Sequence, residues 1–289
     1  MIQFPPKKIL VAYDLSDVSR VAWRHAAALA EACGAELEVV YVEPRLSGME
    51  LGMPTLPQHE LSAPQIRSLR AKIRAVVGTG AKITILQGDP AGRVLSLAAA
   101  RRVNMIVVGT HGRKGLNHLI LGSVAEAVIR GARVPVLAAR GAVRRVRSIL
   151  APVNFTPYSD YGFAYAAAAS AVLSARLTAL HATADPIWEG NPRYKLSSLI
   201  HHLPAEVVKN CKPTAEEAVG SAVKAILKAK RSHDWVVLVA HEKSLLKDAF
   251  FGTTLEQVLR RSSIPVLAVP ATDTPMFAMR LSHGALSRK

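Results

Sequence analysis

Residues 105–126 read MIVVGTHGRKGLNHLILGSVAE, and this stretch decides how the rest of the chain is interpreted. Its first four residues are apolar and rich in β-branched side chains, which predicts a short buried strand. Three glycines follow within seven residues, and they predict a loop whose backbone a ligand can approach closely. Ser123 and Glu126 have the spacing of a capping box, so a helix is expected to start here. A glycine-rich loop before a helix N-terminus favours a phosphate ligand, because the first amide groups of a helix are unpaired.

The glycine spacing is Gly109-x2-Gly112-x9-Gly122-Ser123. This differs from the P-loop pattern Gly-x4-Gly-Lys-Ser/Thr and from the dinucleotide fingerprint Gly-x-Gly-x2-Gly, so both of those sites are excluded. The stretch resembles the universal stress protein family, whose ATP-binding members carry Gly-x2-Gly-x9-Gly-Ser/Thr after the fourth strand of a parallel sheet. All four positions match. The competing interpretation is a loop with no ligand, followed by an ordinary capped helix.

The composition is that of a globular protein with two domains. A chain of 289 residues can bury two cores. Apolar residues make up 50% of it, but the longest such run, residues 162–175, is too short and too rich in alanine to span a bilayer. The N-terminus lacks the apolar core of a signal peptide, which predicts a cytoplasmic protein without a membrane partner. Cys33 and Cys211 are expected to be reduced packing residues.

The formal net charge is +16, and part of it is concentrated between Arg140 and Arg147. Such a charge would help to bind any polyanion. Aromatic residues make up only 5% of the chain, and no stacking motif accompanies the arginines. We therefore expect no specific nucleic-acid binding, and we interpret the cluster as a solvated basic linker.

Strand and helix signals alternate through the first half. Strands are expected at residues 8–13, 36–42, 82–87, 105–108 and 134–138, with helices between them. Ser16, Asp17 or Ser19 can cap the first helix, and Asp89 with Pro90 starts the third. This alternation predicts a doubly wound, Rossmann-like parallel α/β sheet, in which ligands bind beyond the carboxyl ends of the strands. The resemblance implies the strand order 3-2-1-4-5, which puts Asp14 beside Gly109.

The second half repeats the first. A shift of 140 residues aligns residues 9–16 with 149–156, and a shift of 130 aligns residues 134–138 with 264–268. We therefore predict two tandem domains, residues 1–147 and residues 148–289, the second ending in a basic tail. The third strand of the second domain is hard to find between residues 185 and 233. An abbreviated second sheet is expected.

The repeat also serves as an internal control for the phosphate site. In the second half Gly109 is replaced by Val239 and Gly112 by Glu242, while Asn154 replaces Asp14. Valine would crowd a phosphate and glutamate would repel it. We interpret the second domain as one that keeps the fold and has lost the nucleotide.

The family resemblance implies a role for each candidate residue of the first domain. Asp14 would hold the adenine or ribose side, and the backbone of Val42 would face adenine. The phosphates would lie among Gly109, Gly112, Arg113, Gly122 and Ser123, with Val108 and Val124 flanking them. ATP or ADP is the implied ligand, with or without Mg²⁺. The alternative role of Asp14 is to form a turn or to start a helix. The alternative role of Val42 is ordinary packing within a strand.

The implied function is a nucleotide-dependent regulator or adaptor in the stress response, with an unknown protein partner. His111 and Lys114 also lie on the loop, but no nucleophile–base arrangement can be assembled from spacing alone. The alternatives are a nucleotide-free scaffold or chaperone-like adaptor, and a slow ATPase. The fold alone does not distinguish the regulator, the scaffold and the ATPase.

Two matching strands suggest how the domains assemble. Residues 134–138 and 264–268 each contain a proline, which is tolerated at a sheet edge. Two such edges in one chain can cover each other. We therefore expect an internal pseudo-dimer about a pseudo-two-fold axis, with a homo-oligomer as a further expectation.

Overall fold

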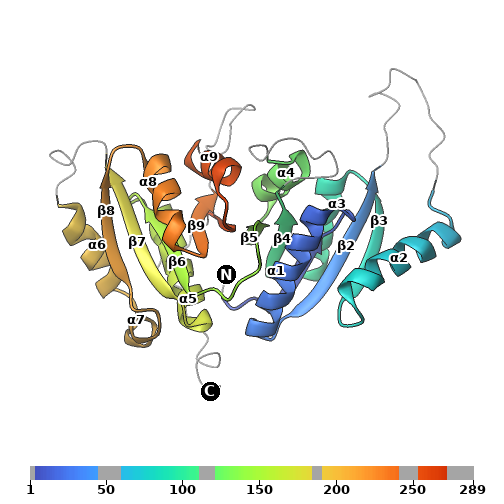
Figure 1. Cartoon of the computed structure of the whole chain (residues 1–289), viewed down its shortest axis with the longest axis horizontal. Helices are drawn as coiled ribbons and strands as arrows, with labels where there is room; N and C mark the ends of the chain where they lie inside the picture. The colour runs from blue at the N-terminus through green and yellow to red at the C-terminus, as the bar shows by residue number, and fades with distance from the viewer. Residues whose placement is uncertain (1–3, 45–59, 111–120, 184–190, 241–252, 272–289) are drawn as a thin grey trace.

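The computed structural model describes residues 4–44, 60–110, 121–183, 191–240 and 253–271 (Figure 1). The first half contains β1 (Lys8–Ala12), α1 (Asp17–Cys33), β2 (Glu36–Pro44), α2 (Ala63–Val77), β3 (Lys82–Gly88), α3 (Pro90–Arg101), β4 (Met105–Gly109), α4 (Ser123–Gly131) and β5 (Val136–Ala139). The expected elements are all present, and their boundaries differ from the predictions by a few residues.

The second half contains β6 (Ser148–Val153), α5 (Pro157–Leu173), β7 (Arg176–Thr183), α6 (Pro192–His201), α7 (Ala205–Cys211), β8 (Thr214–Val219), α8 (Ala222–Ala229), the short 3-10 helix η2 (Lys230–Ser232), β9 (Trp235–Ala240), α9 (Thr253–Arg261) and β10 (Val266–Pro270). The third strand that the sequence did not reveal is β8, which pairs in parallel with β7. The prediction of an abbreviated second sheet is therefore wrong, because the second half has the same number of strands as the first.

All ten strands form one sheet in the order β3-β2-β1-β4-β5-β10-β9-β6-β7-β8. Within each half the order is 3-2-1-4-5 and the pairing is parallel. The expected fold class is thus confirmed in both halves. The strand order of the first half reverses at β1 and β4, and in doubly wound sheets ligands bind beyond the carboxyl ends of the strands at this point.

The two halves are joined by an antiparallel pairing of β5 with β10. Leu137 lies opposite Leu267, and Val136 and Ala138 lie opposite Ala268 and Val266. Leu137 and Leu267 are themselves equivalent under the shift of 130, so each half presents the same strand to the other. This is the isologous pairing expected of a pseudo-two-fold axis, which passes through the two leucines.

A hydrophobic core covers each face of the sheet and runs through both halves. One core packs α1 and α2 together with α5, α6 and α7, and it includes Leu137 and Leu267. The other packs α3 and α4 together with α8 and α9, and it includes Val136 and Val266. Phe4 also crosses between the halves, since its ring meets that of Tyr165 in α5 edge to face at 5.8 Å.

Polar contacts of Arg140 close the junction at one end of the paired strands. Arg140 is 9% exposed, and its guanidinium donates to the carbonyl of Ser262, at the end of α9, over 2.6 Å. Burial lowers the pKa of Arg140 to about 10. His25 of α1 is buried as well, and its Nε2 lies 3.0 Å from the carbonyl oxygen of Arg140. The buried cation thus ties β5 of the first half to α9 of the second.

No helix within the described ranges is both long and apolar enough to cross a membrane.

Candidate functional site

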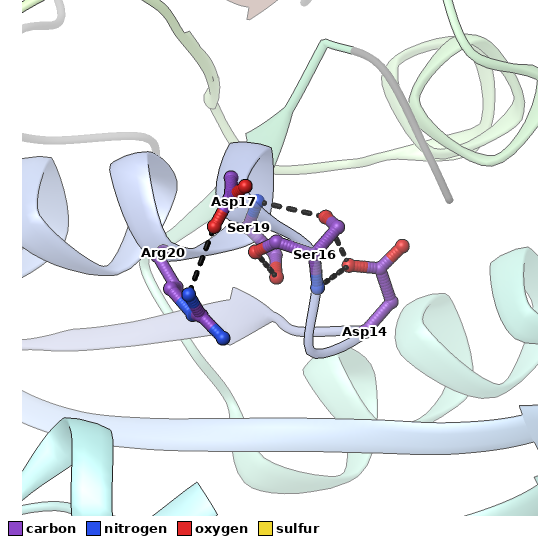
Figure 2. A network of polar contacts seen from close by, with 5 residues as sticks. All are labelled: Asp14, Ser16, Asp17, Ser19 and Arg20. Carbon is purple, nitrogen blue, oxygen red and sulfur yellow. Dashed lines mark hydrogen bonds and ion pairs between the residues drawn. The ribbon is translucent and has the colours of Figure 1, made fainter. Parts of the chain in front are cut away.

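The turn between β1 and α1 is built around Asp14 (Figure 2). Asp14 Oδ1 accepts hydrogen bonds from the backbone N–H of Ser16 over 3.0 Å and from the Ser16 hydroxyl over 2.5 Å. Ser16 is the N-cap of α1, because its Oγ accepts from the N–H of Ser19 over 3.1 Å. Leu15, between them, has a φ of 69°, a left-handed conformation. The turn role that the sequence left open for Asp14 is therefore present.

The second half contains the same turn between β6 and α5. Asn154 Oδ1 accepts from the backbone N–H of Thr156 over 3.3 Å and from its hydroxyl over 2.7 Å. Thr156 is the N-cap of α5 and accepts from the N–H of Ser159. Phe155 has a φ of 57°, as Leu15 has 69°. An amide oxygen therefore builds this turn as a carboxylate oxygen does, and the turn does not explain why residue 14 carries a charge.

Gly109 ends β4 and lies against the first turn of α1. A Cβ added here would lie 2.8 Å from Val18 Cγ1 and 3.0 Å from the Val18 carbonyl oxygen. Since backbone atoms form part of this contact, a larger residue would push α1 away from the sheet. Gly109 is thus required for packing, a role that the sequence pattern did not predict. The close contact also places the first turn of α1 directly against the end of β4.

The second half solves the same packing problem differently. Val239 of β9 replaces Gly109, and the glycine is found on the helix instead, at Gly162 of α5. A Cβ added to Gly162 would lie 2.4 Å from Val239 Cγ2. The small residue has therefore moved from the strand to the helix. Replacement of Gly109 by valine follows from this exchange and is not by itself a sign that a phosphate site was lost.

The N-terminus of α4 differs from the sequence prediction. Gly122 is the N-cap and Ser123 is the first helical residue, so the expected capping box with Ser123 as cap is wrong. Glu126 does not fold back to the cap: its carboxylate lies 3.0 Å from Arg130 and 3.9 Å from Arg260 of α9. Gly122 has no side chain with which to cap the helix. Gly122 therefore contributes no side-chain cap to the first-turn amides of α4, and helix N-termini of this kind are where proteins often bind anions.

Thr110 holds the base of the loop that precedes α4. It is 1% exposed, and its carbonyl accepts from the N–H of Gly122 over 2.7 Å. The end of β4 and the start of α4 are therefore joined directly. The sequence pattern did not single out Thr110. Its position directly after a buried strand and Gly109 could have indicated a residue that fixes the end of β4.

The three candidate valines lie in different surroundings. Val108 is 2% exposed and packs in the core with α3 and α4. Val42 is 8% exposed, and its side chain lies in the same core. Pairing of β1 with β2 ends at Ala12 and Val40, so the side of the Val42 backbone that faces β1 continues past the end of that strand. Val124 is 37% exposed in the first turn of α4. Of the three valines, only Val124 therefore exposes its side chain.

Gly112 and Arg113 lie outside the described residues, as do His111 and Lys114. Among the residues that the structure does describe, no group of three or more histidine, cysteine or carboxylate side chains is placed to hold a metal ion. The described part of the site therefore consists of the Asp14 turn, the Val42 backbone, Gly109 and the start of α4.

A family model for the universal stress protein family matches residues 5–140 and again residues 145–270. The chain belongs to the universal stress protein family. Its two matches fall on the two halves of the ten-stranded sheet. Curated relatives match one half of this chain. A universal stress protein of Methanocaldococcus jannaschii is 35% identical over 138 residues, which is 45% of this chain and 80% of the relative. Another, of Thermus aquaticus, is 35% identical over 136 residues, which is 46% of this chain and 98% of the relative.

Solved structures match the whole tandem arrangement. A universal stress protein of Archaeoglobus fulgidus aligns with a TM-score of 0.71 over 92% of this chain and 99% of its own, at 20% identity. One described as a putative universal stress protein of Pseudomonas aeruginosa aligns with a TM-score of 0.63 over 93% and 95%, at 18% identity. At these identities the likeness shows that the fold is shared.

Proposed function

We propose that this universal stress protein binds one adenine nucleotide, ATP or ADP, in its first half, and that the bound nucleotide regulates its contact with a partner protein. The observation that carries the proposal is the start of α4. This helix has a glycine as its N-cap and lies at the carboxyl ends of the strands, at the edge where Asp14 follows β1. The amide groups of a helix's first turn and the positive end of its dipole suit a phosphate group.

The nucleoside end of the ligand has two candidate contacts. The charge of Asp14 goes beyond what its turn requires, because Asn154 makes the equivalent turn without one. A carboxylate is a strong acceptor for ribose hydroxyl groups. The Val42 backbone, past the end of β1, offers a donor and an acceptor to the edge of an adenine ring. The family resemblance assigns these two positions the same roles.

The second half is proposed to bind no nucleotide. Asn154 stands where the first half has Asp14, and in the sequence Glu242 stands where it has Gly112. A glutamate beside a triphosphate would repel it. One nucleotide per chain is therefore the expected stoichiometry.

A nucleotide-free scaffold is the second candidate, and the packing of Gly109 favours it. If Gly109 is retained only because Val18 approaches so closely, that glycine gives no support to a phosphate site. A continuous sheet through both halves would suit a rigid adaptor. This candidate predicts a chain that is folded and stable without any nucleotide.

Native mass spectrometry of the purified protein and calorimetric titration with ATP and ADP test the proposal. We expect one nucleotide per chain. Gly112→Glu, which copies Glu242, should abolish binding by crowding and charge repulsion. The matched variant Glu242→Gly should leave the stoichiometry at one, since Asn154 still replaces Asp14. Undiminished binding by Gly112→Glu would refute the phosphate site, and no binding by the wild type would support the scaffold. Phosphate release from the loaded protein distinguishes slow hydrolysis from binding alone.

A further inference from the structure

Five exposed arginines gather where the strands of the second half begin. Arg144, Arg145 and Arg147 belong to the segment that links the two halves, Arg176 is the first residue of β7, and Arg231 lies in η2 just before β9. We call these five residues the arginine cluster. They lie at the amino ends of the strands, the edge opposite to the one that carries the turns after β1 and β6.

Hydrogen bonds fix the backbone around three members of the arginine cluster. The N–H of Arg176 donates to the carbonyl of Arg147 over 2.8 Å, so these two residues are neighbours. Asp234 Oδ2 accepts from the N–H of Arg147 over 2.8 Å and from that of Ser148 over 3.0 Å. The Ser148 hydroxyl reaches the carbonyl of Ser232, the residue after Arg231, over 3.3 Å. The linker end is thus fixed between β7 and η2, and the positions of three arginines are set by the fold.

The cluster carries an unbalanced positive charge. Within the described ranges, no carboxylate oxygen lies within 4.0 Å of any of its five guanidinium groups. Asp234 is the nearby carboxylate that the contacts identify, and its Oδ2 is taken up by two backbone amides and the Ser148 hydroxyl. The five charges are therefore exposed to solvent and available to an anion.

The equivalent edge of the first half carries two carboxylates that pair with its cations. There Lys8 of β1 pairs with Glu36 of β2 over 3.6 Å. Glu38 pairs with Lys82 over 3.9 Å and with Arg101 over 3.8 Å. The same register positions in β7 are Arg176, which replaces Glu36, and Thr178, which replaces Glu38. The second half has thus lost two carboxylates from this edge, while the cation gained at Arg176 is offset by Ser148, which replaces Lys8.

We propose that the arginine cluster binds the phosphate backbone of duplex nucleic acid without reading its sequence. Guanidinium groups match phosphate geometry, and a duplex presents closely spaced phosphates along both strands. A single strand would call for aromatic stacking and a membrane for apolar insertion. The exposed large apolar residues of the described chain are Val76, Val124, Tyr158, Tyr194 and Val219, and none belongs to this edge of the second half. The chain's net charge of +16 would draw such a polyanion toward it.

Fluorescence anisotropy with two labelled duplexes of unrelated sequence, each of about 20 base pairs, tests the proposal on the full chain. We expect equal Kd values for the two. The logarithm of the association constant should fall with the logarithm of salt concentration with a slope of about −4.5, since each of five phosphate contacts contributes about 0.9. Between 50 and 200 mM salt, binding should therefore weaken by about 500-fold.

Two triple variants with the same charge change locate the site. Arg144→Gln, Arg145→Gln and Arg147→Gln together should reduce the slope by about 2.7, and Arg176→Gln alone by about 0.9. Lys8→Gln, Lys82→Gln and Arg101→Gln together should leave it unchanged, because those cations already have carboxylate partners. Circular dichroism checks that each variant is folded.

Several results would overturn the proposal. Equal losses in the two triple variants would mean that only net charge matters, and an unchanged slope in both would place any binding elsewhere. A large difference between the two duplexes would show sequence recognition. Binding of inorganic polyphosphate or anionic vesicles without binding of a duplex would assign the arginine cluster to a different partner.

Discussion

The two halves of the protein differ in the residues that the fold does not need. Both halves place a side-chain oxygen at the turn before the first helix, but only Asp14 brings a charge there. At the opposite edge Glu36 and Glu38 pair with cations of the first half, whereas the arginine cluster of the second half has no carboxylate partner among the described residues. Features that are shared belong to the fold, and those that differ are the candidates for function. On this basis we propose a different anion-binding edge for each half.

The same comparison gives one candidate site residue a second explanation. Gly109 looks like part of a phosphate loop in the sequence, yet its missing side chain would collide with Val18 of α1. The second half keeps an equally tight approach between helix and strand with Gly162 and Val239. Because each half has one glycine at this helix–strand contact, Gly109 is explained by packing before any ligand is considered.

The largest expected effect comes from separating the halves. A fragment of residues 1–147 would expose β5, whose four residues are all buried in the intact chain. An unpaired apolar strand edge is a ready template for another strand. We expect this fragment to dimerise through β5 or to aggregate. Light scattering would measure this, and Leu137→Arg in the fragment, at the centre of the pairing, should prevent dimerisation. A soluble, stable monomer of the unmodified fragment would contradict this role of the pairing.

A smaller effect is expected from the exchanged glycines. Gly162→Ala should destabilise the protein by about 1–3 kcal/mol, the usual range for overpacking a core, because the new Cβ meets Val239 Cγ2. Val239→Ala should remove most of that loss, since the obstacle is a side chain. Gly109→Ala should be rescued less by Val18→Ala, because the Val18 carbonyl also blocks the new Cβ. Denaturant unfolding of the two double-mutant cycles would show the difference, and equal rescue would contradict it.

The charge of Asp14 gives the next test. Asp14→Asn should weaken nucleotide binding by about 1–3 kcal/mol, as expected for a lost hydrogen bond to a charged group. The fold should persist, because Asn154 already builds this turn with an amide. The matched control Asn154→Asp should neither create a second site nor alter the first. Calorimetry measures the affinity, and unfolding of Asp14→Asn would show instead that the carboxylate serves the turn.

The smallest effect concerns pH at the junction. Burial lowers the pKa of His25 below its ordinary 6.5, although its contacts with the carbonyls of Arg140 and Gly141 act in the opposite direction. The unfolded chain therefore binds a proton more readily than the folded chain. Stability should fall as pH drops below about 6.5 and should not change above it on account of this residue.

Denaturant midpoints of the wild type and His25→Gln, measured above and below that pH, would show this. Glutamine can still donate to the Arg140 carbonyl but does not titrate, so part of the acid sensitivity should disappear. The exposed His201 provides a control, and His201→Gln should retain the full sensitivity. An identical pH profile for His25→Gln and the wild type would exclude His25 as the cause.

Most of the fold could be predicted because its elements carry local signals. Asp89 with Pro90 marks the start of α3, where Asp89 accepts from Gly92, and Gly34 ends α1 in the left-handed conformation. Buried strands such as β4 are continuous apolar runs. The internal repeat allowed the pairing of the two halves to be predicted, since it aligned the two strands that meet at the junction.

The features that the sequence did not predict correctly also have physical explanations. β8 escaped detection because five of its six residues are exposed, so an edge strand of this kind shows no apolar pattern. Ser123 was predicted to cap α4 because the spacing to Glu126 matched a capping box, but Glu126 instead lies near Arg130 and Arg260. The second of these arginines belongs to the other half, and no local pattern reports such a partner. The contact of Gly109 with Val18 is hidden for the same reason.

The unbroken sheet also has a thermodynamic consequence. Each of its two cores includes residues from both halves, so neither half can open without exposing apolar surface of the other. The chain should then melt as one cooperative unit, with a single calorimetric transition. A ligand that binds only the folded state stabilises everything that unfolds with its site. A nucleotide held near Asp14 would therefore protect the arginine cluster from unfolding, even though the two lie in different halves.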